Sequence, residues 1–160
     1  MTEYGTPDEK IEKLFIEVKE SKNIREWVDF QLLTNNKQKK AYDIIKLNDL
    51  VGALTQGINF AVIINESIFE QLPEELQYIA FDECLTGVCI SDTDAVSLQK
   101  ADFATFTGVL AKYGHENVIK LKESIISLYD TQREEALKEK EQTKSLKAEN
   151  SAKKKNFKHK

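Results

Sequence analysis

The sequence predicts an α+β fold, in which a small domain holds a short β-sheet packed by helices and a long helix follows at the C-terminal end. Three observations predict it: an apolar seven-residue run at 58–64, an apolar stripe at helical spacing in 7–20, and a similar seam in 118–128. With 160 residues, of which 41% are hydrophobic, the chain is long enough for one such domain with a proper core. No apolar run approaches the roughly 18 residues that a membrane span needs.

A first helix is predicted over residues 7–20. Thr6 can cap it, Pro7 suits the first helical position, and Glu9 completes a capping box. Four apolar residues then follow at helical spacing and form one stripe: Ile11, Leu14, Phe15 and Val18.

Two strands are predicted in the first half of the chain. Alternating apolar residues at Val28, Phe30 and Leu32 indicate a strand that ends at the turn 34–36. The run at 58–64, INFAVII, is nearly all apolar, so we expect a strand buried on both faces. Between them, residues 41–54 leave two alternatives open, because they fit either a continuing strand or a helix.

The second half of the chain is predicted to be mostly helical. A short helix is expected at 66–71, and Pro73 opens another that runs to about Val88. Residues 91–94 form a polar loop, and a helix is expected over 102–113, with Gly114 ending it. The last helix begins near Glu116. Its apolar seam comprises Val118, Leu121, Ile125 and Leu128.

Charge divides the chain into an acidic body and a basic tail. Residues 133–160 hold ten Lys or Arg and five Asp or Glu, a net charge of +5, against −9 for residues 1–132. We therefore expect a globular domain at 1–131 and a charged, helical to disordered tail at 132–160, where little apolar surface anchors the helix. The tail is either a solvated terminus or a contact for a protein or nucleic acid. Its candidate partner-binding residues are Lys153, Lys154, Lys155, Lys158 and Lys160.

The helix predicted at 73–88 carries an unusual acid. Four apolar residues and Gly87 fall in one arc of this helix, and Glu83 falls in the middle of the arc. A carboxylate there is costly unless it is paired or functional. Asp82 and Thr86 lie one turn apart on the same helix, which gives the pattern Asp82-Glu83-Cys84-Leu85-Thr86.

This pattern belongs to a longer resemblance. Residues 57–88, GINFAVIINESIFEQLPEELQYIAFDECLTGV, are similar to the core of the phage metallopeptidase family, relatives of the SprT-like zinc proteases. In that family a buried strand and a short helix precede a helix bearing H-E-x-x-H. Residues 102–114, DFATFTGVLAKYG, resemble the segment that follows it, and the likeness spans roughly residues 24–114. The resemblance implies a zincin-like α+β fold and a phage or prophage origin.

The motif departs from the family at its metal ligands. Two histidines one helical turn apart bind zinc, and the glutamate between them activates water. Glu83 stands at the glutamate position here, but Asp82 and Thr86 stand at the two histidine positions. Threonine is a poor zinc ligand, and His115 and His159 cannot rebuild the pair. The resemblance therefore implies a zincin-like fold that has lost its zinc, and we expect no cofactor.

The candidate site residues keep alternative interpretations. Glu83 is either a vestigial structural acid, paired with a lysine or a backbone group, or a catalytic base. Asp82 and Thr86 are expected at the surface or rim. A metal-dependent hydrolase remains the alternative function, with Asp82, His115 and one of Asp92 or Asp94 as atypical ligands and Glu83 as general base.

The two cysteines and the aromatic residues are expected to be structural. Cys84 and Cys89 suit small buried side chains in a reducing compartment. Their alternatives are a metal site with Asp82 or His115, and a cysteine nucleophile with His115 as its base. Trp27 and the phenylalanines are expected in the core.

Together these observations predict a non-catalytic phage protein that binds a host or phage protein or a nucleic-acid complex. The polar, acidic first ten residues do not fit a secretory signal peptide. No membrane association is therefore expected, and the predicted location is the host cytoplasm.

Overall fold

The computed structural model describes residues 3–101 and 105–156, and the side chains of 105–149 in the second range. The chain divides into two compact units, Met1–Ile125 and Ile126–Lys160. The predicted domain boundary lies a few residues later, between 131 and 132.

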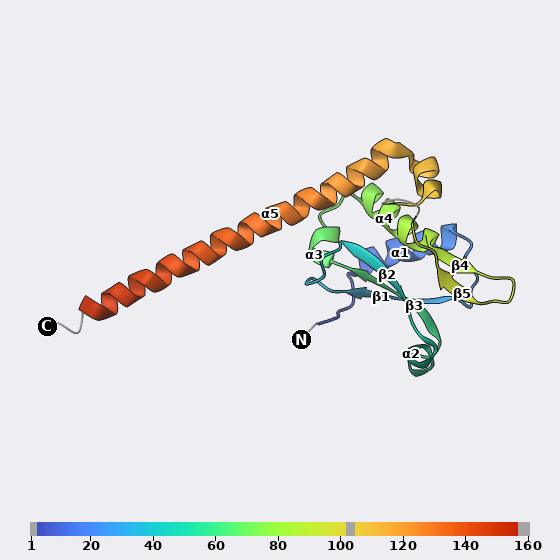
Figure 1. Ribbon diagram of the computed structural model, residues 1–160, viewed down its shortest axis with the longest axis horizontal. Coiled ribbons are helices and arrows are strands. Elements are labelled where there is room, and N and C mark those ends of the chain that lie inside the picture. The colour runs from blue at the N-terminus through green and yellow to red at the C-terminus, as the bar shows by residue number, and fades with distance from the viewer. Residues whose placement is uncertain (1–2, 102–104, 157–160) are drawn as a thin grey trace. The chain divides into compact units, whose positions relative to one another are not determined.

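Helices and strands share the first unit, so the predicted α+β class is confirmed (Figure 1). In chain order the elements are α1 (Glu9–Ser21), β1 (Asp29–Thr34), β2 (Tyr42–Lys46), α2 (Asp49–Leu54), β3 (Ile58–Ile64), α3 (Glu66–Phe69), α4 (Glu74–Thr86), β4 (Val88–Ile90), β5 (Val96–Leu98) and α5 (Thr107–Asn156). The ambiguous stretch 41–54 thus contains both alternatives in succession, first a strand and then a helix.

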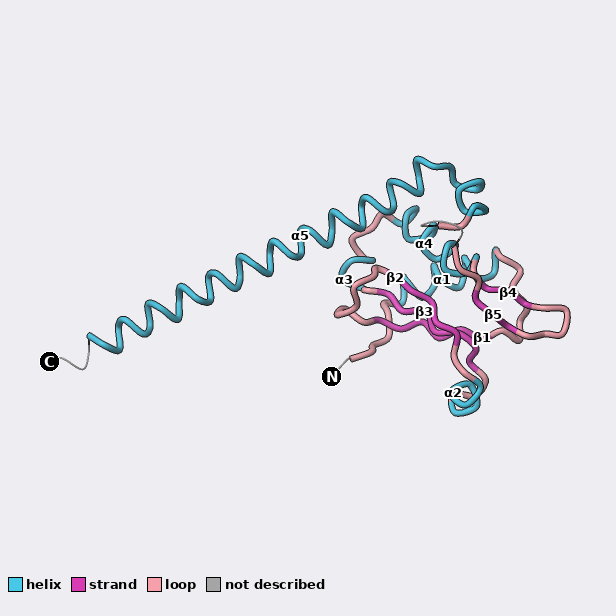
Figure 2. Tube along the Cα trace, in the orientation of Figure 1, coloured by secondary structure: helices cyan, strands magenta, loops and turns pink. Residues whose placement is uncertain are grey.

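A three-stranded sheet in the order β1-β3-β2 forms the centre of the first unit (Figure 2). β3 runs parallel to β1 and antiparallel to β2. The central position explains the apolar run of β3, whose residues from Phe60 to Ile64 are all buried. Both predicted strands are confirmed.

The hairpin of β4 and β5 was not predicted. The preceding helix was predicted to run to about Val88, but α4 ends at Thr86, and residues 91–95 form the hairpin connection. Asp94 has a positive φ of 60°, which Asp tolerates in a tight turn. Strands of three residues are too short to show an alternating pattern, which is why the hairpin was missed.

Helices α1 and α4 lie over the same face of the sheet (Figure 1). The Phe15 ring of α1 lies 5.2 Å from that of Phe81 in α4 and 6.1 Å from that of Phe30 in β1, measured between centroids. The predicted apolar stripe of α1 is fully buried. The prediction that Thr6 caps this helix was wrong. Asp8 is the N-cap, and its side chain accepts a hydrogen bond from the backbone N–H of Lys10 at 2.8 Å.

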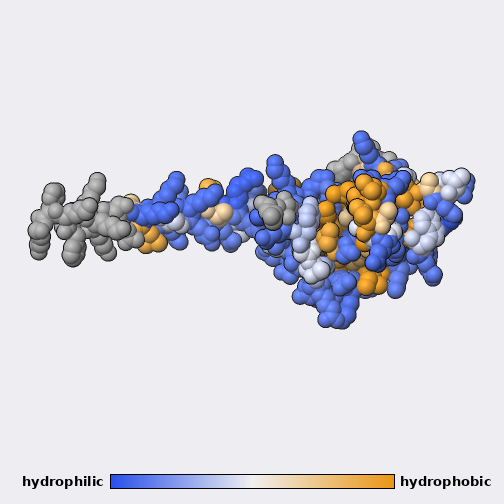
Figure 3. Space-filling view, turned by 90° about the horizontal axis from the view of Figure 1, so that it is seen from below, coloured by the Kyte–Doolittle hydropathy of each residue, from blue (hydrophilic) through white to orange (hydrophobic). Residues whose placement is uncertain are grey.

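The opposite face of the sheet carries a second set of apolar residues. Strand alternation and register place Leu33, Ile45, Ala61 and Ile63 on this face. Ile45 is 45% exposed, and Leu50 and Leu54 of α2 are 70% and 76% exposed. Figure 3, which views the molecule from the side on which α2 lies, shows an apolar area on the first unit.

The first part of α5 completes the unit. The predicted helix start at Asp102 falls on 102–104, outside the described residues, and the helix begins at Thr107. Gly114 has φ 79° and ψ 158° and interrupts the helix, as predicted. Val109, Val118 and Leu121 are buried. The prediction for Trp27 was wrong, because this residue is 44% exposed.

The second unit is helical as far as Asn156. Its large apolar side chains at Ile126, Leu137 and Leu146 are exposed. Lys153, Lys154 and Lys155 fall in the helix, but their side chains are not described, and Lys158 and Lys160 lie outside the described residues. Over 3–101 and 105–156, no helix is long and apolar enough to cross a membrane.

Candidate functional site

Two adjacent carboxylates of α4 form the candidate site. Asp82 is 1% exposed and Glu83 is 6% exposed. The surface or rim position expected for Asp82 is therefore wrong, whereas Thr86 is half-buried. The helix is covered by the sheet and α1, and side chains from the first part of α5 reach its acidic residues, so both acids are enclosed.

The carboxylate of Asp82 receives hydrogen bonds from three side chains. Lys22, the C-cap residue of α1, donates to Oδ1, and the Tyr113 hydroxyl donates to Oδ2. The Nζ of Lys112 lies 2.5 Å from Oδ2. These partners come from the helices on either side of α4, so the buried carboxylate links α1, α4 and α5.

The ammonium of Lys22 also binds Thr86. Its Nζ donates to Thr86 Oγ1 at 2.9 Å, while the Thr86 hydroxyl donates to the backbone carbonyl of Asp82 at 2.6 Å. A lysine ammonium therefore lies between Asp82 and Thr86, the two positions that hold histidines in an H-E-x-x-H helix.

This environment shifts two pKa values in opposite directions. Burial alone would raise the pKa of Asp82, but the hydrogen bonds from Lys112, Lys22 and Tyr113 and the charge of Lys22 together lower it below its usual value. Burial raises the pKa of Tyr113, and the neighbouring Asp82 carboxylate raises it further. Asp82 is thus held as the anion and Tyr113 as the neutral donor.

Glu83 lies in a second cluster of the same kind. Lys122 Nζ lies 2.9 Å from Glu83 Oε1 and 2.8 Å from Oε2, and the Tyr42 hydroxyl donates to Oε2 at 2.6 Å. Lys122 also donates to the Tyr42 oxygen at 2.9 Å. Burial raises the pKa of Tyr42, and the Glu83 carboxylate raises it further. The expectation that Glu83 is paired with a lysine is confirmed.

These residues do not fit a zinc ion. Both oxygens of Asp82 already accept hydrogen bonds, Oδ1 from Lys22 and Oδ2 from Lys112 and Tyr113. The Thr86 hydroxyl oxygen accepts a hydrogen bond from Lys22. A metal at this point would meet the Lys22 ammonium, and the two positive charges would repel each other. The arrangement is suited to hold elements of the fold together, and it offers no set of free zinc ligands.

The other predicted ligands form no metal site in the described part of the chain. His115 and Asp92 are exposed, and Asp94 forms an exposed ion pair with Arg25. In the part of the chain that the structure describes, no three His, Cys, Asp or Glu side chains lie close enough to hold one metal ion. His159 falls outside that part.

The two cysteines are free thiols. Cys84 is buried, as expected, and burial raises its pKa, with a further rise from the Glu83 charge. Cys89 is half-buried, with its Sγ 3.7 Å from the side-chain oxygen of Gln99. A raised pKa keeps Cys84 protonated, which does not suit a nucleophile.

The partners of the two acids were not predicted from the sequence. They are Lys22, Tyr42, Lys112, Tyr113 and Lys122. The central position of Glu83 in an apolar arc indicated that it was paired or functional, but no local pattern indicated which residue would pair with it.

Comparison with known proteins adds no relative. No family model, no curated protein and no solved structure matches the chain. The resemblance to the phage metallopeptidases therefore stays a hypothesis based on the residues of the motif and its flanking segments.

Proposed function

We propose that the chain is a non-catalytic phage protein built on a metallopeptidase-like scaffold, and that it acts by binding a host or phage protein or a nucleic-acid complex in the host cytoplasm. One observation carries the proposal. Lysine ammonium groups neutralise both acids of the motif, Lys22 and Lys112 at Asp82 and Lys122 at Glu83.

The geometry around Glu83 supports a structural role. A general base needs a lone pair within reach of a substrate or a water molecule. Three hydrogen bonds from Lys122 and Tyr42 already use both oxygens of Glu83, which is 6% exposed.

Lys22 offers a reason why the scaffold would persist without a metal. Buried acids without a cation would strongly destabilise the fold. A tethered ammonium supplies the positive charge at Asp82 and joins the end of α1 to α4. We infer that the lysines maintain the scaffold while its surface serves for binding, with the lysines of the C-terminal segment as a further contact.

The experiment is a hydrolysis assay on the full chain and on Glu83→Gln, with a mixed peptide library as substrate and zinc added in one arm. We expect no turnover above buffer from either protein. Turnover by the wild-type chain that disappears in Glu83→Gln, while the variant keeps its cooperative melting transition, would contradict the proposal. Glu70→Gln, a change of the same kind at an exposed residue, is the matched control.

A further inference from the structure

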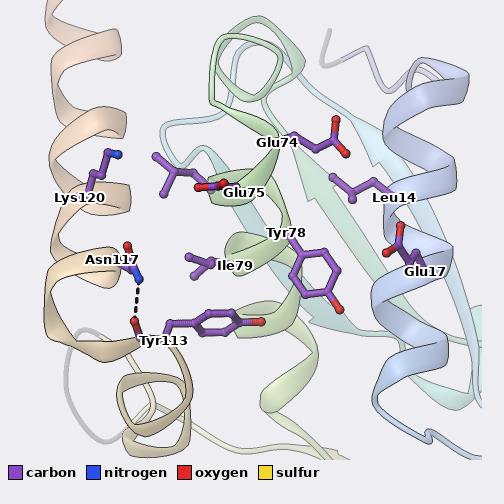
Figure 4. A pocket seen from close by; sticks show the side chains of 10 residues that line it. Leu14, Glu17, Glu74, Glu75, Tyr78, Ile79, Tyr113, Asn117 and Lys120 are labelled. Carbon is purple, nitrogen blue, oxygen red and sulfur yellow. Dashed lines mark hydrogen bonds between the residues drawn. The ribbon is translucent and has the colours of Figure 1, made fainter.

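A groove of about 590 Å³ runs over α4 between α1 and the early part of α5 (Figure 4). The α4 residues Leu76 and Ile79 form its apolar floor, and Leu14 lines it from α1. The rings of Tyr78 and Tyr113 line it from α4 and α5. A volume of this size is in the range of pockets that bind small molecules or one or two side chains of a peptide.

The rim of the groove is acidic. Glu17, Glu74 and Glu75 line it, against one lysine, Lys120. Glu74 is paired with Lys10 at 3.3 Å, and both side chains are exposed. Neither Glu17 nor Glu75 forms an ion pair with any residue that the structure describes. Two exposed carboxylates at the rim therefore remain without a cation.

The aromatic wall is held in place before any ligand binds. The hydroxyl of Tyr113 donates to Asp82, and the hydroxyl of Tyr78 lies 3.3 Å from Ser21 Oγ. Fixed side chains lose little entropy when a ligand binds. The faces of tyrosine rings attract lysine and arginine side chains, as Lys112 shows with its Nζ 5.1 Å from the Tyr113 ring centroid. The ring of Tyr78 and the acidic rim therefore both favour a positively charged ligand.

We propose that this groove binds a basic peptide segment of a protein partner, one that presents an apolar side chain flanked by lysine or arginine. The apolar side chain packs on the floor at Ile79 and between the tyrosines, and the flanking cations reach Glu17 and Glu75. Nucleic acid does not suit this surface, because its phosphates would meet the same carboxylates. The inference rests on the proposed function and names a surface and a partner class for it.

The test is a titration of the isotope-labelled full chain with three short peptides, followed by NMR. The first is acetyl-KKLFKK-amide, and the others are acetyl-KKSSKK-amide, which lacks the apolar pair, and acetyl-EELFEE-amide, which reverses the charge. We expect saturable shifts at residues lining the groove with the first peptide, and binding at least about tenfold weaker with the other two. Raising the salt concentration should weaken binding of the first peptide, because the rim charges are exposed.

Variants that change the charge of the rim test whether the peptide binds in the groove. Glu17→Gln combined with Glu75→Gln should weaken binding of the first peptide about three- to tenfold, the loss expected for two exposed ion pairs. The matched control, Glu12→Gln combined with Glu20→Gln, changes the charge by the same amount on exposed α1 residues outside the groove, and it should alter affinity less than twofold. Lys120→Glu should strengthen binding about two- to fivefold.

Three results would overturn the inference: no saturable binding of the first peptide, equal binding of the acidic peptide, or an equal loss in the double variant and its control. Saturable binding of a single-stranded oligonucleotide at the same groove residues would also overturn it. Mass spectrometry of the recovered peptides separates this inference from the proposed function. A cleaved peptide contradicts the non-catalytic proposal, whereas an intact peptide that does not bind contradicts only the groove.

Discussion

Replacing Asp82 with asparagine removes the negative charge of the buried cluster with almost no change in shape. The carboxylate is 1% exposed and receives hydrogen bonds from Lys22, Lys112 and Tyr113. The asparagine amide keeps one carbonyl acceptor but places an N–H₂ donor where a second acceptor stood. The ammonium of Lys22 or of Lys112 then faces this N–H₂ donor in an enclosed site. This unsatisfied contact is the main source of the expected loss of stability.

The expected loss can be estimated from these contacts. A hydrogen bond to a charged group contributes about 1.5–3 kcal/mol, and such contributions are not additive in one network. The side chain of Lys112 is 52% exposed, so its share is below about 1 kcal/mol, whereas that of Lys22 is 19% exposed. Breaking a buried pair costs about 3–5 kcal/mol. We expect Asp82→Asn to lower the free energy of unfolding by about 3 kcal/mol.

Thermal and urea unfolding of the full chain, followed by circular dichroism, measure this loss. For a unit spanning Met1–Ile125, an unfolding entropy of about 2.1 cal/mol/K per residue converts 3 kcal/mol into a melting temperature about 11 °C lower. Asp94→Asn is the matched control, because Asp94 pairs with Arg25 at the surface, and it should change stability by less than about 1 kcal/mol. Equal effects of the two variants would refute the reasoning.

The pH dependence tests the same cluster. Because the pKa of Asp82 is lower in the folded protein than in the unfolded chain, the unfolded chain takes up its proton first as the pH falls. The stabilisation by Asp82 is therefore complete above about pH 4, the ordinary value, and is lost as the pH falls through the lower, folded-state pKa. The difference in stability between wild type and Asp82→Asn should shrink in acid. A difference that stays constant down to pH 2 would contradict this.

Other predictions follow from the remaining contacts. Glu83→Gln should lower the free energy of unfolding by about 1–3 kcal/mol, because Lys122 loses its anion; an unchanged urea midpoint would refute the pairing. A thiol reagent should modify Cys89 first and Cys84 only on unfolding, because burial raises the pKa of Cys84; reaction of both thiols in the folded protein would contradict its burial. Deleting residues 153–160 should leave the cooperative melt unchanged and remove any salt-sensitive binding of nucleic acid; loss of the melt would show that the segment is needed for folding.

The local pattern of apolar residues was sufficient to predict the elements in which that pattern is strong. The run of β3 predicted its bounds and its burial on both faces, which its place between two other strands explains. The stripe of α1 predicted its buried residues. By contrast, the hairpin of β4 and β5 has too few residues in each strand for a pattern, and Val88 continued the apolar sequence of α4.

The candidate site could be predicted only in part. Glu83 was expected to be either paired, with a lysine or a backbone group, or catalytic, and it is paired with Lys122, 39 residues further along the chain. Asp82 was expected at the surface or rim. Tertiary contacts from both sides enclose it, since Lys22 lies 60 residues before it and Lys112 lies 30 residues after it. Pairings over such separations leave no mark on local sequence.

The central claim is that lysine ammonium groups, and no metal, neutralise the acids of the motif. Elemental mass spectrometry tests it most directly, on the full chain purified without a chelator and without a histidine tag. The account predicts less than about 0.1 zinc per chain, unchanged after dialysis against zinc and removal of the excess. About one zinc per chain, retained by the wild type and lost in Asp82→Asn, would contradict it.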